Sequence, residues 1–246
     1  MEDVTIDAIT AGFTLAQRRR GHRTSTDDLL TGWYAMEQVA APARALDLGS
    51  GVGSVALLVA WRAPEARIIA VEAQDESVAL LRENVARNGL DGRVTVVHAD
   101  LREGRFADEA CELVTGTPPY FDVRAGVVPA DSQKAHARFE LRGDVRDYAI
   151  AARAALAPGG RFVFCFPSAQ RPRAETAVVA AGLAVVRARE VVPRAGLPPL
   201  FTLFACALAE EARAPATEEP PHVVRGADGA PTAAHAAARA TFGFGP

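Results

Sequence analysis

The sequence predicts an α/β fold: a doubly wound, mostly parallel sheet with one antiparallel closing strand and helices on both faces. Two observations predict it. From Ala43 to about residue 208, short apolar runs typical of strands alternate with longer segments of helical pattern, as in repeated strand–helix–strand units. The last two strand-like runs are joined by the turn-rich sequence PRAGLPP, which indicates a closing hairpin and therefore one antiparallel strand.

The first half of this pattern contains four strands. RALDLG leads into a glycine loop and a helix, and ARIIAVEA leads into a helix that stops at Asn88-Gly89. RVTVVHAD and CELVTGT follow as two more apolar strand-like runs. We therefore expect strands at 44–49, 66–73, 93–100 and 111–117, and helices at 54–63 and 75–90.

The second half begins with DVRDYAIAARAALAPGG, an amphipathic helix that ends in a Pro-Gly-Gly stop. The apolar run RFVFCF follows it directly as a strand. We expect helices at 144–160 and near 175–181, and strands at 161–166, 183–192 and 200–208.

Two regions flank the central domain, which we expect at residues 43–208. Residues 1–42 form an N-terminal extension in which the basic cluster QRRRGHR precedes STDDLLTGWYAMEQVA, a capped amphipathic helix by its pattern. Residues 209–246 form a tail rich in alanine and proline. Within the tail we expect EEARAPATEEPP to be a loose linker and HVVRGADGAPT to be a small hairpin.

Composition limits the classes of function. The chain has 246 residues, 49% of them hydrophobic, and a net charge of −3, so a nucleic-acid partner would have to meet a local basic patch. Cys111, Cys165 and Cys206 lie far apart in apolar runs, so we expect buried reduced thiols and no metal site. MEDVTID has no apolar signal core, and the longest apolar run is about half a membrane span. We expect a soluble cytoplasmic protein without a membrane partner.

The glycine loop LDLGSGVGSVALL holds Asp47, Gly49, Gly51 and Gly53 between the first strand and its helix. Glycines there let the backbone approach a ligand closely, and the helix N-terminus favours polar or anionic groups. The spacing is acid-x-G-x-G-x-G, whereas the dinucleotide fingerprint G-x-G-x-x-G requires glycine where this chain has Ser54. This difference disfavours a dehydrogenase.

Two further acids end the next two strands. At the end of the second strand, the Glu72 carboxylate can accept hydrogen bonds from ribose hydroxyls, and at the end of the third, Asp100 can accept from an adenine amino group. Each acid alone could equally cap the following helix. Together with Asp47 they share the carboxyl edge of the sheet, where open α/β sheets bind ligands, so a nucleoside-cofactor site is favoured.

The fourth strand ends in GTPPYF. Two prolines and two aromatic residues can simply stop a strand and pack on the core. The stretch is similar to the Asn/Asp-Pro-Pro-Tyr motif of methyltransferases that act on planar amino nitrogens, in which this position faces the methyl donor. The resemblance implies a substrate role instead. An exocyclic amino nitrogen is a poor nucleophile because its lone pair is delocalised, and a side-chain oxygen together with a proline-linked carbonyl could hold it in its pyramidal form. The Tyr120 ring could stack on the plane of such a substrate.

The glycine loop with its acids resembles that of the S-adenosylmethionine-dependent methyltransferases of the Rossmann-like class. GHRTSTDDLLTGWYA, TPPYFDVRAG, AHARFE and DYAIAARAALAPGGRFVFCFPS resemble the family that methylates adenine N6 in valine tRNA, over roughly residues 12–208. The chain departs from the family pattern at Thr117, where the family has asparagine and a longer acceptor.

The resemblance implies a Rossmann-like methyltransferase domain, S-adenosylmethionine as cofactor and adenine N6 of a tRNA as the methyl acceptor. It implies that Asp47 lies near the methionine moiety, that Glu72 binds the ribose and that Asp100 binds the adenine ring. The implied cofactor-binding residues are Asp47, Gly49, Gly51, Gly53, Glu72, Asp100 and Leu101, and the implied catalytic residues that hold the target are Thr117, Pro118, Pro119 and Tyr120.

Two other functions are compatible with the same motifs. Methyltransferases that act on a protein side-chain amide or a small molecule also use a loop of the Asn-Pro-Pro-Tyr type. A non-catalytic nucleoside-binding or RNA-binding module could have lost its chemistry through Thr117.

The candidate contacts to tRNA are basic residues. Arg18, Arg19, Arg20, His22 and Arg23 in QRRRGHR could contact phosphates, and the alternative is a solvated basic arm. In ARFE, Arg138 could contact a phosphate or form a structural ion pair with Glu140.

Overall fold

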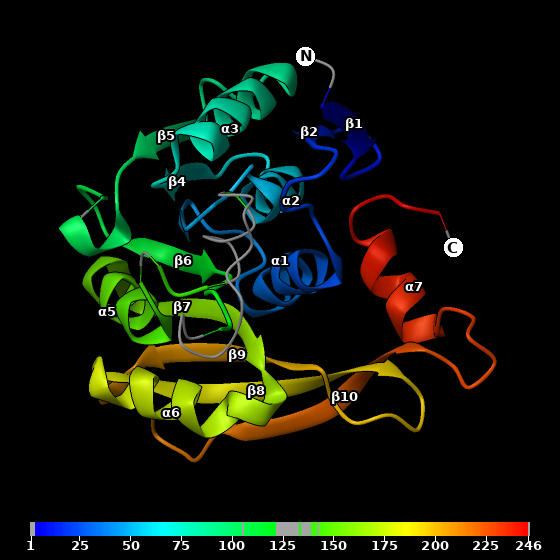
Figure 1. Cartoon of the computed structure of the whole chain (residues 1–246). Helices are drawn as coiled ribbons and strands as arrows, with labels where there is room; N and C mark the ends of the chain where they lie inside the picture. The colour runs from blue at the N-terminus through cyan, green and yellow to red at the C-terminus, as the bar shows by residue number, and fades with distance from the viewer. Residues whose placement is uncertain (1–2, 105, 122–132, 134–138, 142, 246) are drawn as a thin grey trace.

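The computed structural model describes residues 3–104, 106–121, 133, 139–141 and 143–245. In this part of the chain an eight-stranded sheet carries helices on both faces, and a separate two-stranded hairpin lies near the N-terminus (Figure 1). The predicted doubly wound α/β fold is confirmed. Arg138, a predicted tRNA contact, lies outside the described residues.

The main sheet has the strand order β10-β8-β9-β7-β6-β3-β4-β5. Strand β9 runs antiparallel to both of its neighbours, β7 and β8, and the other neighbouring pairs are parallel. The predicted antiparallel strand is therefore confirmed. The strands are β3 (Arg44–Leu48), β4 (Arg67–Glu72), β5 (Val94–His98), β6 (Cys111–Gly116), β7 (Leu156–Pro167), β8 (Leu183–Arg194), β9 (Phe201–Leu208) and β10 (Thr217–Arg225).

The helices bury two apolar clusters, one on each face of the sheet. In β3, Ala45 belongs to the first cluster and Leu46 to the second, because successive strand side chains point to opposite faces. The first cluster is covered by α1 (Thr26–Gln38), α2 (Ser54–Arg62) and α3 (Asp75–Arg87), and the second by α5 (Val145–Ala155) and α6 (Arg171–Ala180). Three short 3-10 helices, η1 (Leu101–Glu103), η2 (Ser168–Gln170) and η3 (Ala209–Glu211), follow strand ends.

The boundary between α5 and β7 differs from the sequence prediction. Asp144 caps α5 by accepting hydrogen bonds from the backbone N–H groups of Arg146 and Asp147, as predicted for a helix that begins there. The helix ends at Ala155, before the Pro-Gly-Gly stop, because Leu156 already pairs with Cys111 of β6. Ala157 precedes Pro158 and is therefore disfavoured in a helix, so the helix cannot continue to the Pro-Gly-Gly stop. The strand begins at Leu156, earlier than the sequence indicated.

The N-terminal extension is an ordered hairpin and a helix. Strands β1 (Val4–Ala8) and β2 (Thr14–Arg18) pair antiparallel. The side chain of Asn84 in α3 bonds both the N–H and the C=O of Ala16, with distances of 2.6 and 2.9 Å, and so ties the hairpin to the domain. Helix α1 follows at the predicted place.

The structure contradicts the predicted loose linker of residues 210–221 over its second part, 217–221, which belongs to a strand. Residues Thr217–Arg225 form β10, which pairs in parallel with β8 at the edge of the main sheet, and α7 (Ala233–Ala240) packs beside α1 (Figure 1). Glu219 explains much of this difference, because its carboxylate meets Arg187 at 3.0 Å and Arg189 at 3.1 Å on β8. The small hairpin expected at residues 222–232 has its first arm within β10, and the turn that follows is closed by a bridge between Arg225 and Pro231.

The three cysteines are free and buried, as predicted. None of the described helices is long and apolar enough to cross a bilayer. Among the described residues, no group of three or more metal-ligating side chains gathers at one place.

Candidate functional site

A cavity of about 430 Å³ opens at the carboxyl edge of the sheet, where β3, β4, β5 and β6 end. Its walls come from loops after these strands and from the segment that leads into α1. The lining residues are 22, 24, 25, 27 and 28 before and within α1, 49–52 and 54 in the glycine loop, 71–74 and 77 around β4 and α3, 99 and 101 after β5, 117–121 after β6, and 133 and 148.

The glycine loop forms the floor of the cavity. Gly49 and Gly51 have φ angles of +62° and +56°, in the left-handed region that favours glycine. A Cβ at Gly49 would lie 2.0 Å from the Tyr148 hydroxyl oxygen, whereas a Cβ at Gly51 would meet no atom within 4 Å. The space above Gly51 therefore belongs to the cavity, and a side chain there would occupy it.

Glu72 holds its carboxylate rigidly at the cavity wall. The residue is 6% exposed. Its Oε2 accepts from the Gly51 N–H at 2.8 Å, and its Oε1 accepts from the N–H groups of Ala73 and Gln74 at 2.9 and 2.8 Å. These bonds link the end of β4 to the glycine loop, occupy both lone pairs of Oε1 and leave one lone pair of Oε2 for a ligand hydroxyl.

Asp47 does not line the cavity. It is 3% exposed and its Oδ1 accepts from the Thr115 hydroxyl at 2.7 Å. Burial is the main reason that the pKa of Asp47 is raised to about 6. The carboxylate thus lies behind the glycine loop and joins β3 to β6.

Asp100 and Leu101 differ in their position relative to the cavity. Leu101 lines the cavity, whereas the Asp100 carboxylate accepts from Nε and Nη2 of Arg102 at 2.9 and 2.6 Å and caps η1 through the Arg102 N–H. Asp100 is absent from the lining of the described cavity.

Gln74 is a cavity residue that the sequence analysis missed. Its Oε1 is buried and has no hydrogen-bond partner among the residues that the structure describes. A buried acceptor without a partner is costly, and this one belongs to a residue that lines the cavity. A polar residue two positions after Glu72, at the same strand end, was the available signal.

The TPPY loop forms the wall opposite Glu72 and its neighbours in the chain, and all four residues, Thr117 to Tyr120, line the cavity together with Phe121. The Tyr120 hydroxyl donates to Asp27 Oδ2 at 2.9 Å and lies 3.2 Å from Cys165 Sγ. Burial raises the pKa of Tyr120 well above its usual range. The loop is therefore fixed to the start of α1 through the tyrosine hydroxyl.

Two carboxylates at the start of α1, Asp27 and Asp28, also line the cavity and were missed. Asp28 is 8% exposed, and its Oδ2 accepts from the Ser25 N–H at 3.0 Å. Burial, followed by repulsion from Asp27, raises the pKa of Asp28. The capping pattern STDD was recognised in the sequence, but nothing local indicated that the cap would face a ligand cavity.

The predicted basic cluster does not form one surface. Arg18 pairs with Asp3 and Glu76, and Arg23 pairs with Asp7. Arg19 and Arg20 are exposed. Of the four arginines of this cluster, Arg18 and Arg23 thus form ion pairs with acidic side chains of the same chain.

Known proteins share this architecture. A family model described as methyltransferase small domain matches residues 33–171. A tRNA1(Val) (adenine(37)-N6)-methyltransferase of Aeromonas hydrophila is 34% identical over 165 residues, which are 65% of this chain and 67% of that protein. A Bacteroides thetaiotaomicron protein of the same name is 30% identical over 188 residues, 76% of this chain and 77% of that protein.

Among solved structures, a predicted O-methyltransferase from Agrobacterium tumefaciens superimposes with a TM-score of 0.66 at 20% identity, covering 88% of this chain and 96% of that one. This likeness concerns the fold, while the family model covers the glycine loop, Glu72 and the TPPY loop. The chain therefore belongs to the methyltransferase small domain family and is an S-adenosylmethionine-dependent methyltransferase.

Proposed function

We propose that the protein binds S-adenosylmethionine in the cavity at the carboxyl edge of the sheet and methylates adenine N6 of a tRNA. One observation carries this proposal: the glycine loop with Glu72 and the TPPY loop line a single cavity. A methyl donor held by the glycine loop and Glu72 would lie next to an amino nitrogen held by the TPPY loop. The names of the Aeromonas and Bacteroides relatives support tRNA as substrate, and a tRNA substrate implies action in the cytoplasm.

The residues of the cavity fit the proposed cofactor. Its volume of about 430 Å³ lies in the range of small-molecule sites. Glu72 Oε2 would accept from a ribose hydroxyl, and Gln74 would line the same wall of the cavity. The adenine ring would lie against Leu101, beside Asp100, and the methionine end would lie over Gly49 and the glycine loop. Asp47 would support that loop from behind rather than touch the ligand.

On the target side, Thr117 Oγ1 and the Pro118 carbonyl would accept from the amino group and favour its pyramidal form, and Pro119 and Tyr120 would shape the slot. When bound, S-adenosylmethionine would supply an electrophilic methyl carbon to this amino nitrogen, with S-adenosylhomocysteine as the leaving product and one proton lost from the nitrogen to solvent. Orientation of the two reactants within the cavity accounts for much of the rate.

A methyl-transfer assay tests this function. Purified protein with methyl-tritiated S-adenosylmethionine is offered total RNA and total protein in parallel, and labelled RNA is digested to nucleosides for chromatography. We expect label in N6-methyladenosine of the tRNA fraction. Glu72→Gln removes the charged acceptor and should weaken cofactor binding by about 1–3 kcal/mol, whereas Asp75→Asn, at a side chain that is 97% exposed, serves as the matched control.

Other outcomes overturn the proposal in different ways. Label in protein side-chain amides without label in RNA would assign a protein methyltransferase. Binding of S-adenosylhomocysteine by calorimetry, with no transfer to either fraction, would assign a non-catalytic binding module.

A further inference from the structure

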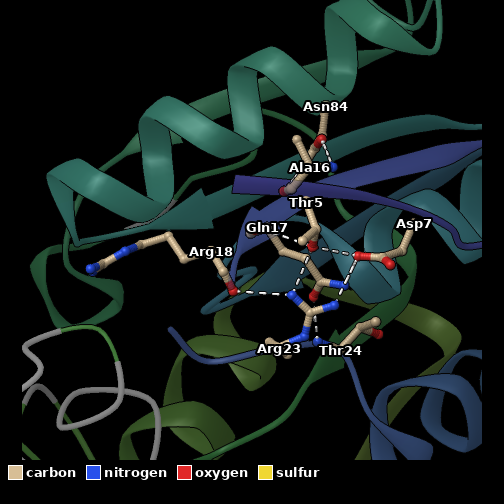
Figure 2. Close-up of polar contacts among 8 residues, drawn as sticks. All are labelled: Thr5, Asp7, Ala16, Gln17, Arg18, Arg23, Thr24 and Asn84. Carbon is tan, nitrogen blue, oxygen red and sulfur yellow. Dashed lines mark hydrogen bonds and ion pairs between the residues drawn. The ribbon is translucent and has the colours of Figure 1, made fainter. Parts of the chain in front are cut away.

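The segment 22–25 forms one wall of the proposed cofactor cavity. His22, Thr24 and Ser25 line the cavity, as do Asp27 and Asp28 in the helix that follows. Arg23, in the middle of this wall, does not line it. Its side chain turns instead toward the N-terminal hairpin (Figure 2).

Arg23 makes three contacts to the hairpin. Its Nη1 donates to Thr5 Oγ1 at 2.8 Å and to the Arg18 carbonyl oxygen at 3.2 Å, and its Nη2 donates to Asp7 Oδ2 at 2.9 Å. The Thr5 hydroxyl in turn donates to Asp7 Oδ2 at 2.7 Å. A guanidinium presents its donors in a fixed planar fork, so these contacts fix the direction of the chain at Arg23.

Gln17 of β2 makes a second link between the hairpin and the wall. This side chain is 1% exposed. Its Nε2 donates to Asp7 Oδ2 and its Oε1 accepts from the Thr24 N–H, both at 2.9 Å. Asp7 Oδ2 is therefore shared by Thr5, Gln17 and Arg23, and hydrogen bonding, chiefly from Gln17, holds the pKa of Asp7 below its usual range.

The hairpin is itself tied to the glycine loop. Asn84, which is fully buried, bonds both backbone groups of Ala16 (Figure 2). It also donates to the Val52 carbonyl oxygen at 2.9 Å. Continuous hydrogen bonding thus runs from the glycine loop through Asn84 and β2 to the opposite cavity wall. The hairpin therefore contacts both the glycine loop, through Asn84, and the wall formed by residues 22–25.

We propose that Arg23 is a positioning residue for the methyl donor, and that the β1–β2 hairpin is a strap that sets the width of the donor site. This inference rests on the proposed function for the identity of the ligand. It departs from the sequence-based expectation, because it gives Arg23 a role in cofactor affinity and not in phosphate contact. Three hydrogen bonds tie the Arg23 guanidinium to the hairpin, whereas Arg20, three residues earlier, is exposed.

The test compares Arg23→Met with Arg20→Met, which makes the same chemical change on the same segment. Calorimetry with S-adenosylhomocysteine is expected to give a dissociation constant about three- to tenfold higher for Arg23→Met and an unchanged one for Arg20→Met. KM for S-adenosylmethionine should rise for Arg23→Met while kcat at saturation is kept, because the defect lies in donor binding. An unaltered dissociation constant in folded Arg23→Met overturns the proposal.

A second pair of variants distinguishes an effect on cofactor affinity from a general loss of stability. Arg23→Lys keeps a cation for Asp7 and should restore part of the affinity. Thr5→Val removes a hydroxyl that is remote from the cavity, and its effect on affinity should be less than additive with that of Arg23→Met, because both act through the same bonds. Additive effects, or a lower melting temperature with unchanged affinity, would make the network structural only.

The wild-type result separates this inference from the proposed function. If the wild-type protein binds no S-adenosylhomocysteine, the cofactor assignment fails. If the wild type binds it and Arg23→Met binds it equally well, only the strap fails.

Discussion

Thr117 and Tyr120 stand at the two ends of the TPPY loop, and their surroundings differ. Tyr120 is held by Asp27 through its hydroxyl and meets the Phe166 ring edge-on, with centroids 5.9 Å apart. Its ring is therefore fixed, and its hydroxyl already has a partner. Thr117 lines the cavity and is only half-buried, so we propose its hydroxyl as the acceptor for a substrate amino group.

Thr117→Val keeps the shape of the side chain and deletes this acceptor. We expect kcat to fall about three- to tenfold, the effect of losing one neutral hydrogen bond in the reacting complex, while the affinity for S-adenosylhomocysteine is kept. Thr117→Asn offers a longer acceptor and should maintain or raise adenine methylation. Steady-state kinetics on the tRNA substrate measures both.

Two results would count against this role of Thr117. Full turnover in Thr117→Val would make the hydroxyl structural. Loss of activity in Thr117→Asn would indicate a pocket shaped for a different group, and the tRNA adenine assignment would then be abandoned.

Among the elements, the N-terminal hairpin divides the basic residues into two groups. Arg18 and Arg23 are paired with acids, so their charges are compensated within the protein. Arg19 and Arg20 follow β2 and are exposed. Long-range attraction of a phosphate backbone depends on uncompensated charge, so these two arginines are the part of the predicted contact set that we retain.

The double variant Arg19→Gln/Arg20→Gln tests this surface. We expect weaker tRNA binding and a salt dependence reduced by about one to two counterions, with unchanged affinity for S-adenosylhomocysteine. Arg67→Gln is the control, because Arg67 is exposed at the start of β4, at the opposite edge of the sheet from the cavity. Filter binding across a salt series measures the slope, and equal slopes for the double variant and wild type would remove the arm from the interface.

Across the whole molecule, α1 is enclosed by distant parts of the chain. Tyr34 of α1 donates to Glu219 Oε2 of β10 at 2.7 Å, and the Trp33 ring lies 5.0 Å from the His222 ring. His222 Nε2 lies 3.2 Å from His235 Nδ1 of α7, and the two histidines are 3% and 9% exposed. The C-terminal elements thus stabilise the helix whose first turn faces the cavity.

This arrangement predicts a pH dependence of stability. Burial, followed by repulsion from His235 and Arg189, lowers the pKa of His222 to about 4. A lowered pKa means that the unfolded chain binds the proton more tightly than the folded protein does. The contribution of neutral His222 to the unfolding free energy is therefore fully present above the ordinary histidine pKa of about 6.5 and is lost as the pH falls toward 4. We expect this site to remove about 1–3 kcal/mol of unfolding free energy over that range.

His222→Gln keeps a polar partner for His235 but cannot titrate, so its stability should fall less between pH 7 and pH 4.5. Urea denaturation at several pH values measures this, with His98→Gln as a control at a 40% exposed side chain. Burial raises the pKa of Asp28 and Asp47, so protonation of these two carboxyls stabilises the folded protein as the pH falls, opposite to the effect of His222. The effect of His222 is therefore measured as the difference between His222→Gln and wild type. Identical pH profiles for His222→Gln and wild type would contradict the prediction.

The sequence by itself determined the sheet, its helices and the edge at which the site lies. Strand and helix periods are local properties, and parallel strands must end at a common edge. The glycine loop, Glu72 and the TPPY loop could therefore be assigned to one site from their places after strand ends. Which of the strand-end acids face the cavity could not be read in this way, because Asp47 and Asp100 turn toward Thr115 and Arg102.

Only the tertiary structure decided the roles of the two chain ends. The segment that becomes β10 contains prolines and acids, which are locally typical of a linker, and it pairs with β8 because Arg187 and Arg189 there compensate Glu219. Arg23 is a residue of the type that contacts phosphates, but its side chain donates hydrogen bonds to Thr5 and Asp7 of the hairpin. The bond between Asp27 and Tyr120 joins residues 93 positions apart. Such pairings depend on long-range contacts of the folded chain, which no local pattern encodes.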